Sequence, residues 1–440
     1  MLQRIKEQAK NKHFLSLSTN VFTSGCAMLI FILLLRSMEI DHMGYWIFFQ
    51  TTLSLLDTFR SGFLQMALIK FYSGAARPRA REVLGSIWFL AISITLFWFV
   101  VTIPAFFLLP YIEDVSIQIV VKWFAVVFFL TLPYSITLWR LQADQKFKQL
   151  LTLSMINQLT FLTTIILLMV FDQMSINNLL YANALTCTIT SSICLLTGWS
   201  GFRYVVKKTR TCMQEIYHFG KFSVGTSISS NLLRSSDIFM INFLLGPALI
   251  PVYNVAQRLM EVIEIPLRSF LVTGMPALST AFNQKRNHDV VAIMEKYSGM
   301  LTLALIPVTI VGVALADFAV GLLGGGKYLG TDAANIFRIL LVISIIYPID
   351  RFSGVTLDII NQPKRNFYKV ILMLIINVIG NYIGILWLGD LYGVVLSSVL
   401  AFAIGFLYSY TSLQEFLTFN IKGILNTGVK DLKLLYLKIF

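Results

Sequence analysis

Ionisable side chains lie inside long apolar segments of this 440-residue chain, where an unpaired charge is costly. The densest group is Arg258, Glu261, Glu264 and Arg268. At 100° per residue on a helix, these four side chains fall within an arc of about 120°, so they form one polar stripe. Because four charges facing lipid would be prohibitive, we expect this stripe to border a hydrated cavity.

The deep arginines and carboxylates suggest two kinds of chemistry. The planar guanidinium of arginine makes two parallel charge-assisted hydrogen bonds with a diphosphate, whereas a buried carboxylate can bind a proton or a sodium ion. The candidate substrate-binding residues are Arg60, Arg234, Arg258, Arg268 and Arg351. The candidate coupling carboxylates are Asp57, Asp237, Glu261 and Glu264.

Structural pairing is the alternative interpretation of two of these groups. Asp57 and Arg60 are three residues apart, as are Arg234 and Asp237, so each pair shares a helix face and could neutralise itself. The apolar segments also contain asparagines, most of which we expect to hydrogen-bond between helices: Asn20, Asn157, Asn183, Asn231, Asn254, Asn377 and Asn381.

The chain lacks the residue patterns of an enzyme site. Its four histidines form no metal-ligand spacing. The stretch 321–327 fits the opening of a phosphate-binding loop, but Tyr328 replaces the Ser or Thr that would hold magnesium. We therefore expect no enzymatic activity, no metal site and no cofactor, with a proton or a sodium ion as the candidate coupling ion.

Twelve long apolar runs account for most of the chain. A helix needs about 20 apolar residues to cross a bilayer, and the runs lack the alternation of barrel strands. The sequence therefore predicts an all-α integral membrane protein. The predicted spans are 15–36, 44–70, 83–109, 118–140, 151–171, 177–201, 219–245, 252–279, 297–323, 334–358, 367–388 and 391–411. Prolines at 104, 133, 266, 307 and 348 could bend several of them.

Basic residues predict which loops are cytoplasmic. The net charge is +13, and Lys and Arg concentrate in alternate loops, for example Lys364, Arg365 and Lys369 beside the tenth span. Because basic loops stay in the cytoplasm, we expect both termini there, including Arg4, Lys6, Lys10 and Lys12 at the start of the chain. The same rule explains the basicity without nucleic acid, since no soluble basic domain is present.

The spans divide into two halves of six. A Tyr-containing segment opens the second span at Tyr45 and the eighth span at Tyr253. Both halves then start from the cytoplasm, as in transporters built from two parallel repeats. We expect an N-terminal lobe at 1–201, a cytoplasmic linker at 202–218, a C-terminal lobe at 219–411 and a cytoplasmic tail at 412–440.

Several short motifs carry a family resemblance. Phe-Gly-Lys-Phe-Ser-Val-Gly begins at Phe219, Val-Tyr-Asn-Val-Ala-Gln-Arg-Leu begins at Val252, and Pro-Ala-Leu-Ser begins at Pro276. Leu-Gln-Ala-Asp-Gln-Lys-Phe begins at Leu141, and Asn-Gln-Pro-Lys begins at Asn361. With these motifs the chain resembles bacterial polysaccharide exporters, the O-antigen or Wzx-type flippases. Their MOP superfamily also contains multidrug/toxin extruders and the lipid II flippase.

The resemblance implies a fold like that of the multidrug/toxin extruders (MATE), with twelve helices in two lobes, in the bacterial inner membrane. It implies transfer of an undecaprenyl-diphosphate-linked oligosaccharide from the cytoplasmic to the outer leaflet by alternating access. The implied partners are that lipid-linked substrate, membrane lipid and other polysaccharide-assembly membrane proteins. A cation-coupled multidrug antiporter and a membrane glycan polymerase are the alternatives, although the short outer loops disfavour a polymerase.

Overall fold

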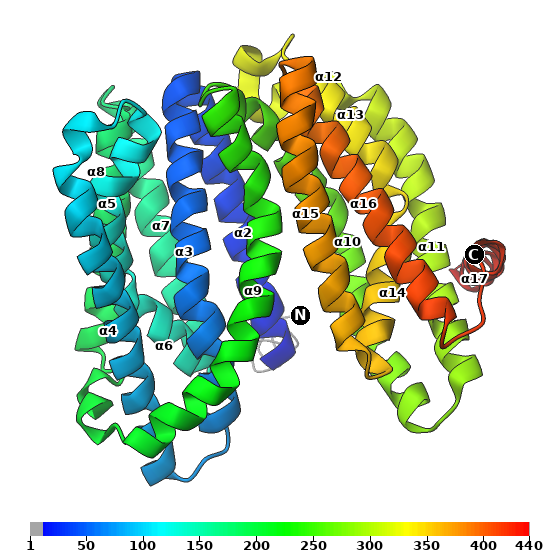
Figure 1. The fold of residues 1–440 in the computed structure, drawn as a ribbon, viewed down its shortest axis with the longest axis horizontal. Helices are drawn as coiled ribbons and strands as arrows, with labels where there is room; N and C mark the ends of the chain where they lie inside the picture. The colour runs from blue at the N-terminus through cyan, green and yellow to red at the C-terminus, as the bar shows by residue number, and fades with distance from the viewer. Residues whose placement is uncertain (1–11, 440) are drawn as a thin grey trace. The chain divides into compact units, whose positions relative to one another are not determined.

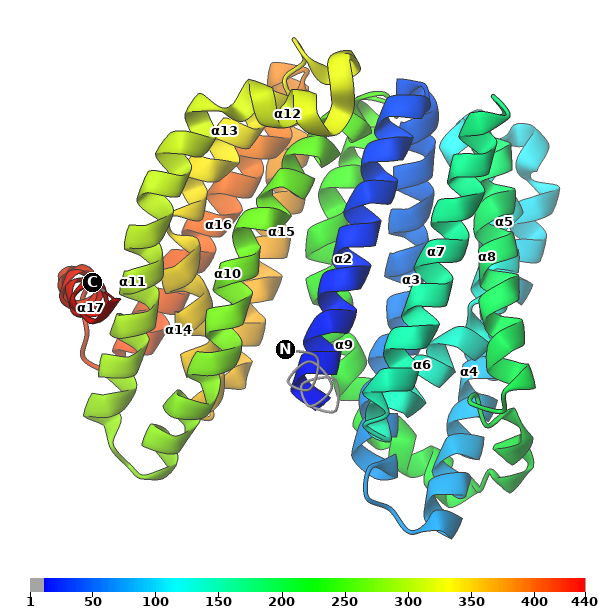
Figure 2. The ribbon, with the colours of Figure 1, turned by 180° about the vertical axis from the view of Figure 1, so that it is seen from behind.

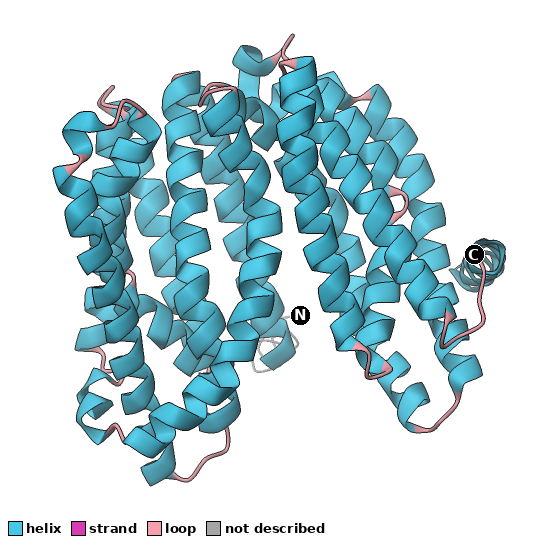
Figure 3. Ribbon diagram, viewed as in Figure 1, coloured by secondary structure: helices cyan, strands magenta, loops and turns pink. Residues whose placement is uncertain are grey.

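The described part of the chain consists of helices and connecting loops, without strands (Figure 3). The computed structural model describes residues 12–439, and the side chains at 12–18, 221–223, 226, 272–273 and 434–439 are outside that description. The basic residues expected at the cytoplasmic N-terminus, Arg4, Lys6 and Lys10, lie outside the described residues. The expected all-α architecture is confirmed.

The first compact unit comprises Met1–Asn231. Its core includes Trp88, whose indole Nε1 donates a hydrogen bond to the carbonyl of Ser200 at 2.9 Å. Its elements, coloured blue to green in Figure 1, are α2 (Lys12–Ser37), α3 (Ile40–Tyr72), α4 (Arg77–Phe107), η1 (Leu109–Tyr111), α5 (Val115–Leu130), α6 (Leu132–Ala143), α7 (Phe147–Val170), α8 (Ile176–Leu196), η2 (Phe202–Lys207) and the first part of α9 (Arg210–Leu244).

The second compact unit comprises Leu232–Phe440, so the boundary falls inside α9. The lobe and linker boundaries expected from the sequence stay predictions. Besides the end of α9, the unit contains α10 (Leu249–Asn283), α11 (Asn287–Ala314), α12 (Ala316–Gly324), η3 (Gly325–Tyr328), α13 (Ala333–Ser344), α14 (Tyr347–Ile359), α15 (Pro363–Leu388), α16 (Leu391–Gln414) and α17 (Ile421–Ile439).

The helices identify a multi-pass membrane protein. Seven described helices are long and apolar enough to cross a membrane, and nine spans result if each of two bent helix pairs is one span. Three other long helices, α3, α9 and α10, contain 33, 35 and 35 residues and carry most of the deep charges. Together these elements match the twelve predicted runs, although the count of twelve spans stays a prediction.

Two predicted spans are bent in the structure. The run 118–140 is α5 followed by α6, bent by 43°, and the run 334–358 is α13 followed by α14, bent by 51°. Pro133 and Pro348 stand in the first turn of α6 and α14, where a proline needs no N–H partner. The bent pairs are the fourth and tenth runs, six apart, which fits two similar halves.

The ninth predicted span, 297–323, is wrong only in its last third, which is not part of the same helix. Helix α11 ends at Ala314, and a separate short helix, α12, begins at Ala316. Most of the predicted tail at 412–440 is also helical, because α17 covers Ile421–Ile439. Helices α15 and α16 pack closely at Gly384 and Gly393, where a Cβ on either glycine would lie within 2.6 Å of the other's backbone.

Candidate functional site

The interior of the second unit contains a carboxylate held by hydrogen bonds from three helices. Asp237 on α9 is buried, and its Oδ2 accepts hydrogen bonds from Tyr253 Oη at 2.5 Å and Ser398 Oγ at 3.2 Å. Its Oδ1 accepts a hydrogen bond from Asn381 Nδ2 at 2.8 Å. No described Lys or Arg side chain forms an ion pair with Asp237. Its charge, when present, is therefore compensated by neutral donors alone.

Further polar side chains hydrogen-bond to the groups that contact this carboxylate. Asn377 accepts a hydrogen bond from Ser236 Oγ at 2.7 Å and donates one to Ser398 Oγ at 3.2 Å. Gln257 donates to Tyr253 Oη at 2.7 Å. The side-chain oxygen of Asn381 is buried without a hydrogen-bond partner among the described atoms. We refer to Asp237, Tyr253, Asn377, Asn381 and Ser398 as the Asp237 centre.

Asp237 was one of the candidate coupling carboxylates, whereas Tyr253 and Ser398 were not among the candidate site residues. The proposed alternative pairing with Arg234 is not formed, because Arg234 is exposed while Asp237 turns to the interior. Asn377 and Asn381 were expected to link helices, and their spacing of four residues on one face of an apolar helix was the signal available. Tyr253 gave no chemical signal, since the carboxylate to which it donates, Asp237, lies on another helix.

The predicted polar stripe on α10 is present and neutralises itself in pairs. Arg258 Nη1 lies 2.9 Å from Glu261 Oε2, and Arg268 Nη2 lies 2.9 Å from Glu264 Oε2. The side chains of Arg258, Glu261 and Arg268 are 39%, 56% and 59% exposed. The stripe thus lies on the surface of its unit, and its expected position beside a hydrated cavity stays a prediction.

Helix α10 connects the stripe to the Asp237 centre. Tyr253 and Gln257 stand on α10 one turn apart, and Arg258, the first residue of the stripe, follows Gln257 directly. A displacement of Tyr253 by a change at Asp237 would therefore act on the helix that carries the stripe. A donor to the buried carboxylate and a predicted arginine therefore stand on the same helix, five residues apart.

Arg60 and Asp57 form the expected pair in the first unit. The side chain of Arg60 is 1% exposed, and its Nη2 lies 2.5 Å from Asp57 Oδ1. Its Nη1 also donates to the carbonyl of Phe128 at 3.0 Å, and its Nη2 donates to Thr131 Oγ1 at 3.0 Å. These acceptors stand at the break between α5 and α6, so Arg60 holds the bend. Asp57 is 31% exposed and remains accessible.

A second buried ion pair lies beside the bend between α13 and α14. Lys369 Nζ on α15 lies 2.9 Å from Asp350 Oδ1 on α14, and Ser409 Oγ on α16 donates to the same oxygen at 3.1 Å. The expectation that Lys369 is a loop charge is wrong, because it is buried inside the helix bundle. Arg351, one of the candidate substrate-binding arginines, follows Asp350 directly in the sequence and is half-buried.

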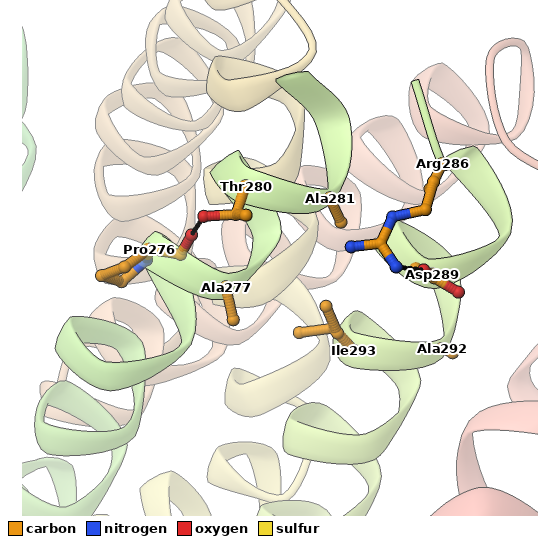
Figure 4. Close-up of a pocket in the computed structure, with 8 residues that line it drawn as sticks. All are labelled: Pro276, Ala277, Thr280, Ala281, Arg286, Asp289, Ala292 and Ile293. Carbon is orange, nitrogen blue, oxygen red and sulfur yellow. Dashed lines mark hydrogen bonds and ion pairs between the residues drawn. The ribbon is translucent and has the colours of Figure 1, made fainter. Parts of the chain in front are cut away.

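A surface pocket of about 520 Å³ lies between the ends of α10 and α11 (Figure 4). Arg286 and Asp289 form an ion pair of 2.8 Å at one side of it. None of the predicted site residues is among its lining residues in the described part of the chain, which are Pro276, Ala277, Thr280, Ala281, Arg286, Asp289, Ala292 and Ile293. We therefore do not assign the predicted substrate to this pocket.

Comparison with known sequences relates the chain to glycan assembly. The model of a family described as polysaccharide biosynthesis protein matches residues 34–333. A probable low-salt glycan biosynthesis flippase, Agl15, from Haloferax volcanii is 21% identical over 209 residues, which are 48% of this chain. The match covers 44% of Agl15, so the chain spans less than half the length of this relative.

Comparison with solved structures shows the fold. The lipid II flippase MurJ in an inward closed conformation matches with a TM-score of 0.73 at 17% identity, over 97% of this chain and 93% of that one. An inward-facing multidrug resistance MATE family transporter of the MOP superfamily matches with a TM-score of 0.71 at 13% identity, over 89% of this chain and 94% of that one. The expected MOP transporter fold is confirmed.

Proposed function

The chain belongs to the polysaccharide biosynthesis protein family, and from this premise we propose that it is a flippase for a lipid-linked glycan. The proposed substrate is an undecaprenyl-diphosphate-linked oligosaccharide, such as an O-antigen or another surface polysaccharide repeat unit. The proposed direction is from the cytoplasmic to the outer leaflet of the inner membrane, by alternating access. The names of two relatives, a probable glycan biosynthesis flippase and a lipid II flippase, support this class of substrate.

The observation that carries the proposal is the link along α10 between the Asp237 centre and the stripe. A transporter driven by an ion gradient needs an ion-responsive group that is coupled to its substrate-binding surface. Asp237 supplies the responsive group, and Tyr253 and Gln257 connect it to the helix that bears Arg258. In this proposal, a change at Asp237 reaches Arg258 through a movement of α10 alone, and no further residues need to relay it.

Arg258 and Arg268 are the arginines that we propose to contact the diphosphate. Each is paired with one glutamate on the same helix, and each is more than one third exposed. A diphosphate oxygen can replace the glutamate, because a guanidinium binds phosphate through two parallel hydrogen bonds. Arg234 and Arg351 are secondary candidates, whereas Arg60 is enclosed by protein in this conformation.

Asp237 is the carboxylate that we propose to couple transport to a proton or a sodium ion. Its oxygens and the unpartnered side-chain oxygen of Asn381 are the kind of ligands that a hard cation prefers. Protonation would instead convert one carboxylate oxygen into a donor and displace one of the three present donors. Either event would change the hydrogen bond to Tyr253. Asp57, Glu261 and Glu264 remain further candidates for coupling.

Leaflet transfer in vesicles tests the proposed function. The protein is reconstituted with a fluorescent undecaprenyl-diphosphate oligosaccharide, and a membrane-impermeant glycosidase reports how much substrate reaches the outer leaflet. Arg258→Gln and Arg268→Gln should each reduce the transfer rate at least tenfold. Arg286→Gln, which removes an exposed and similarly paired arginine outside the stripe, is the matched control and should retain the rate. Full transfer by both stripe variants would contradict the proposal.

Measurements in cells separate this function from its main alternative. Deletion of the gene should remove surface glycan and cause the lipid-linked precursor to accumulate on the inner leaflet. A cation-coupled multidrug antiporter, which the MATE-like fold also accommodates, would leave surface glycan unchanged and would lower resistance to cationic dyes. That outcome would replace the flippase proposal.

A further inference from the structure

The last helix, α17, packs crosswise on the outside of α11 within the second unit. Both views show α17 end-on beside α11, which runs along the bundle (Figures 1 and 2). The two helices meet at glycines, since a Cβ on Gly428 would lie 2.5 Å from the backbone of Gly299. Thr427 Oγ1 also donates a hydrogen bond to Glu295 Oε2 at 3.1 Å. These contacts fix the height at which α17 crosses α11.

The crossing point lies where α11 changes from polar to apolar. The first part of α11 carries Asp289, Glu295 and Lys296, whereas the part after Gly299 is almost entirely apolar up to Ala314. Ile306 and Ile310 in this later part are exposed, as expected for side chains facing lipid. Helix α17 is therefore held at the level at which the apolar surface of its unit begins.

Helix α17 has three distinct faces. Ile424 and Gly428 are buried against the bundle. At 100° per residue, the neighbouring face contains four apolar residues within an arc of about 80°, and two of them are 40% and 42% exposed. The residues of this apolar flank are Ile421, Leu425, Val429 and Leu432. The exposed side chains of this apolar flank lie next to the buried face, where lipid would cover them in a membrane.

A basic edge borders the apolar flank on the side away from α11. Lys422 and Lys433 follow the flank directly around the helix, and Lys430 lies one further step around. All three are exposed. The described acidic residue of the helix, Asp431, lies on the side of the buried face instead. The order of buried face, apolar flank and lysine edge is the arrangement of a helix lying in the plane of a membrane surface.

We propose that α17 is an interfacial helix that binds anionic lipid headgroups of the leaflet in which it lies. The apolar flank enters the boundary of the acyl chains, and the lysine edge contacts phosphate groups at the surface. The leaflet is the cytoplasmic one if the basic loops have their expected side. Each lysine near an anionic surface strengthens binding roughly fivefold, so three lysines contribute on the order of 100-fold.

Hydrogen–deuterium exchange on the full chain in nanodiscs tests this site. The discs contain either phosphatidylcholine alone or phosphatidylcholine with about one third phosphatidylglycerol, and peptides from 421–433 are followed. Exchange in these peptides should be at least several-fold slower in the anionic discs. The variant with Lys422→Gln, Lys430→Gln and Lys433→Gln should exchange equally in both discs. All three lysines are exposed, so their replacement leaves the packing against α11 intact.

A charge-matched control distinguishes a local site from a general effect of charge. The variant with Lys146→Gln, Lys148→Gln and Lys364→Gln removes three exposed positive charges at the starts of α7 and α15 and should retain the slowing by anionic lipid. Equal exchange of wild-type α17 in both discs would overturn the proposal. The same conclusion would follow if the α17 variant kept the slowing, because the lysine edge would then not be the lipid contact.

Discussion

Asn381 donates its side-chain N–H to Asp237 at 2.8 Å, while its own side-chain oxygen has no hydrogen-bond partner among the described atoms. A buried amide oxygen without a donor is unfavourable by about 1–3 kcal/mol. It stands next to a carboxylate whose charge is balanced only by neutral donors. Under the proposed coupling role of Asp237, the side-chain oxygen of Asn381 is a candidate second ligand for the coupling cation.

This relationship predicts the effect of removing the charge at Asp237. In Asp237→Asn the side chain keeps its size but no longer responds to protons or cations, so transport should lose its dependence on the ion gradient and slow at least tenfold. Leaflet transfer is measured with and without a sodium or proton gradient. Asp289→Asn, which removes an exposed carboxylate, is the control and should transport normally. Gradient-dependent transfer by Asp237→Asn would exclude Asp237 as the coupling group.

Removal of one donor should change the ion response without abolishing it. Tyr253→Phe keeps the buried ring but removes the 2.5 Å hydrogen bond to Asp237. Because the charged carboxylate then has fewer donors, a proton or cation should neutralise it more readily. Half-maximal transport should therefore occur at a lower concentration of the coupling ion. Tyr392→Phe, at the start of α16, is the control. An unchanged or higher half-maximal concentration in Tyr253→Phe would count against this role.

The buried pair of Asp350 and Lys369 should be important for stability. Lys369→Met leaves a buried charge without its partner, which should lower the free energy of unfolding by about 3–5 kcal/mol. Adding Asp350→Asn to that variant should recover most of the loss, because no charge then remains buried. Thermal unfolding in detergent measures both variants. If the single and double variants are equally unstable, the pair is not what stabilises this part of the bundle.

Arg60 should act on the bend between α5 and α6. Arg60→Lys keeps the charge but cannot make hydrogen bonds to Asp57, the carbonyl of Phe128 and Thr131 together. We expect a lower unfolding temperature with an unchanged half-saturating substrate concentration. Thermal unfolding and the substrate dependence of leaflet transfer are measured side by side. A large increase in that concentration at unchanged stability would instead identify Arg60 as a substrate contact.

Local sequence patterns account for a large part of these features. Apolar runs matched the helices, Pro133 and Pro348 lie at the two bends, and the spacing of three residues indicated the pair of Asp57 and Arg60. The Asp237 centre was not accessible in this way. Asn381 and Ser398 lie 144 and 161 residues from Asp237, and no local pattern specifies a contact over such distances. Lys369 was misplaced for the same reason, because its burial depends on Asp350 and Ser409 from other helices.

The stripe offers a test that separates charge position from charge balance. Exchanging the partners in the double variant Arg258→Glu with Glu261→Arg keeps the net charge and allows the same ion pair along α10, so the protein should fold with little change in stability. The guanidinium, however, moves by three positions along the helix. If Arg258 contacts the diphosphate, leaflet transfer should fall at least tenfold, since a displacement of a few ångströms breaks a two-point contact. The corresponding exchange of Arg286 with Asp289 should leave transfer unchanged. Equal transfer by both exchanged variants would mean that the stripe needs only its charge balance, and Arg258 would then have no specific role in substrate binding.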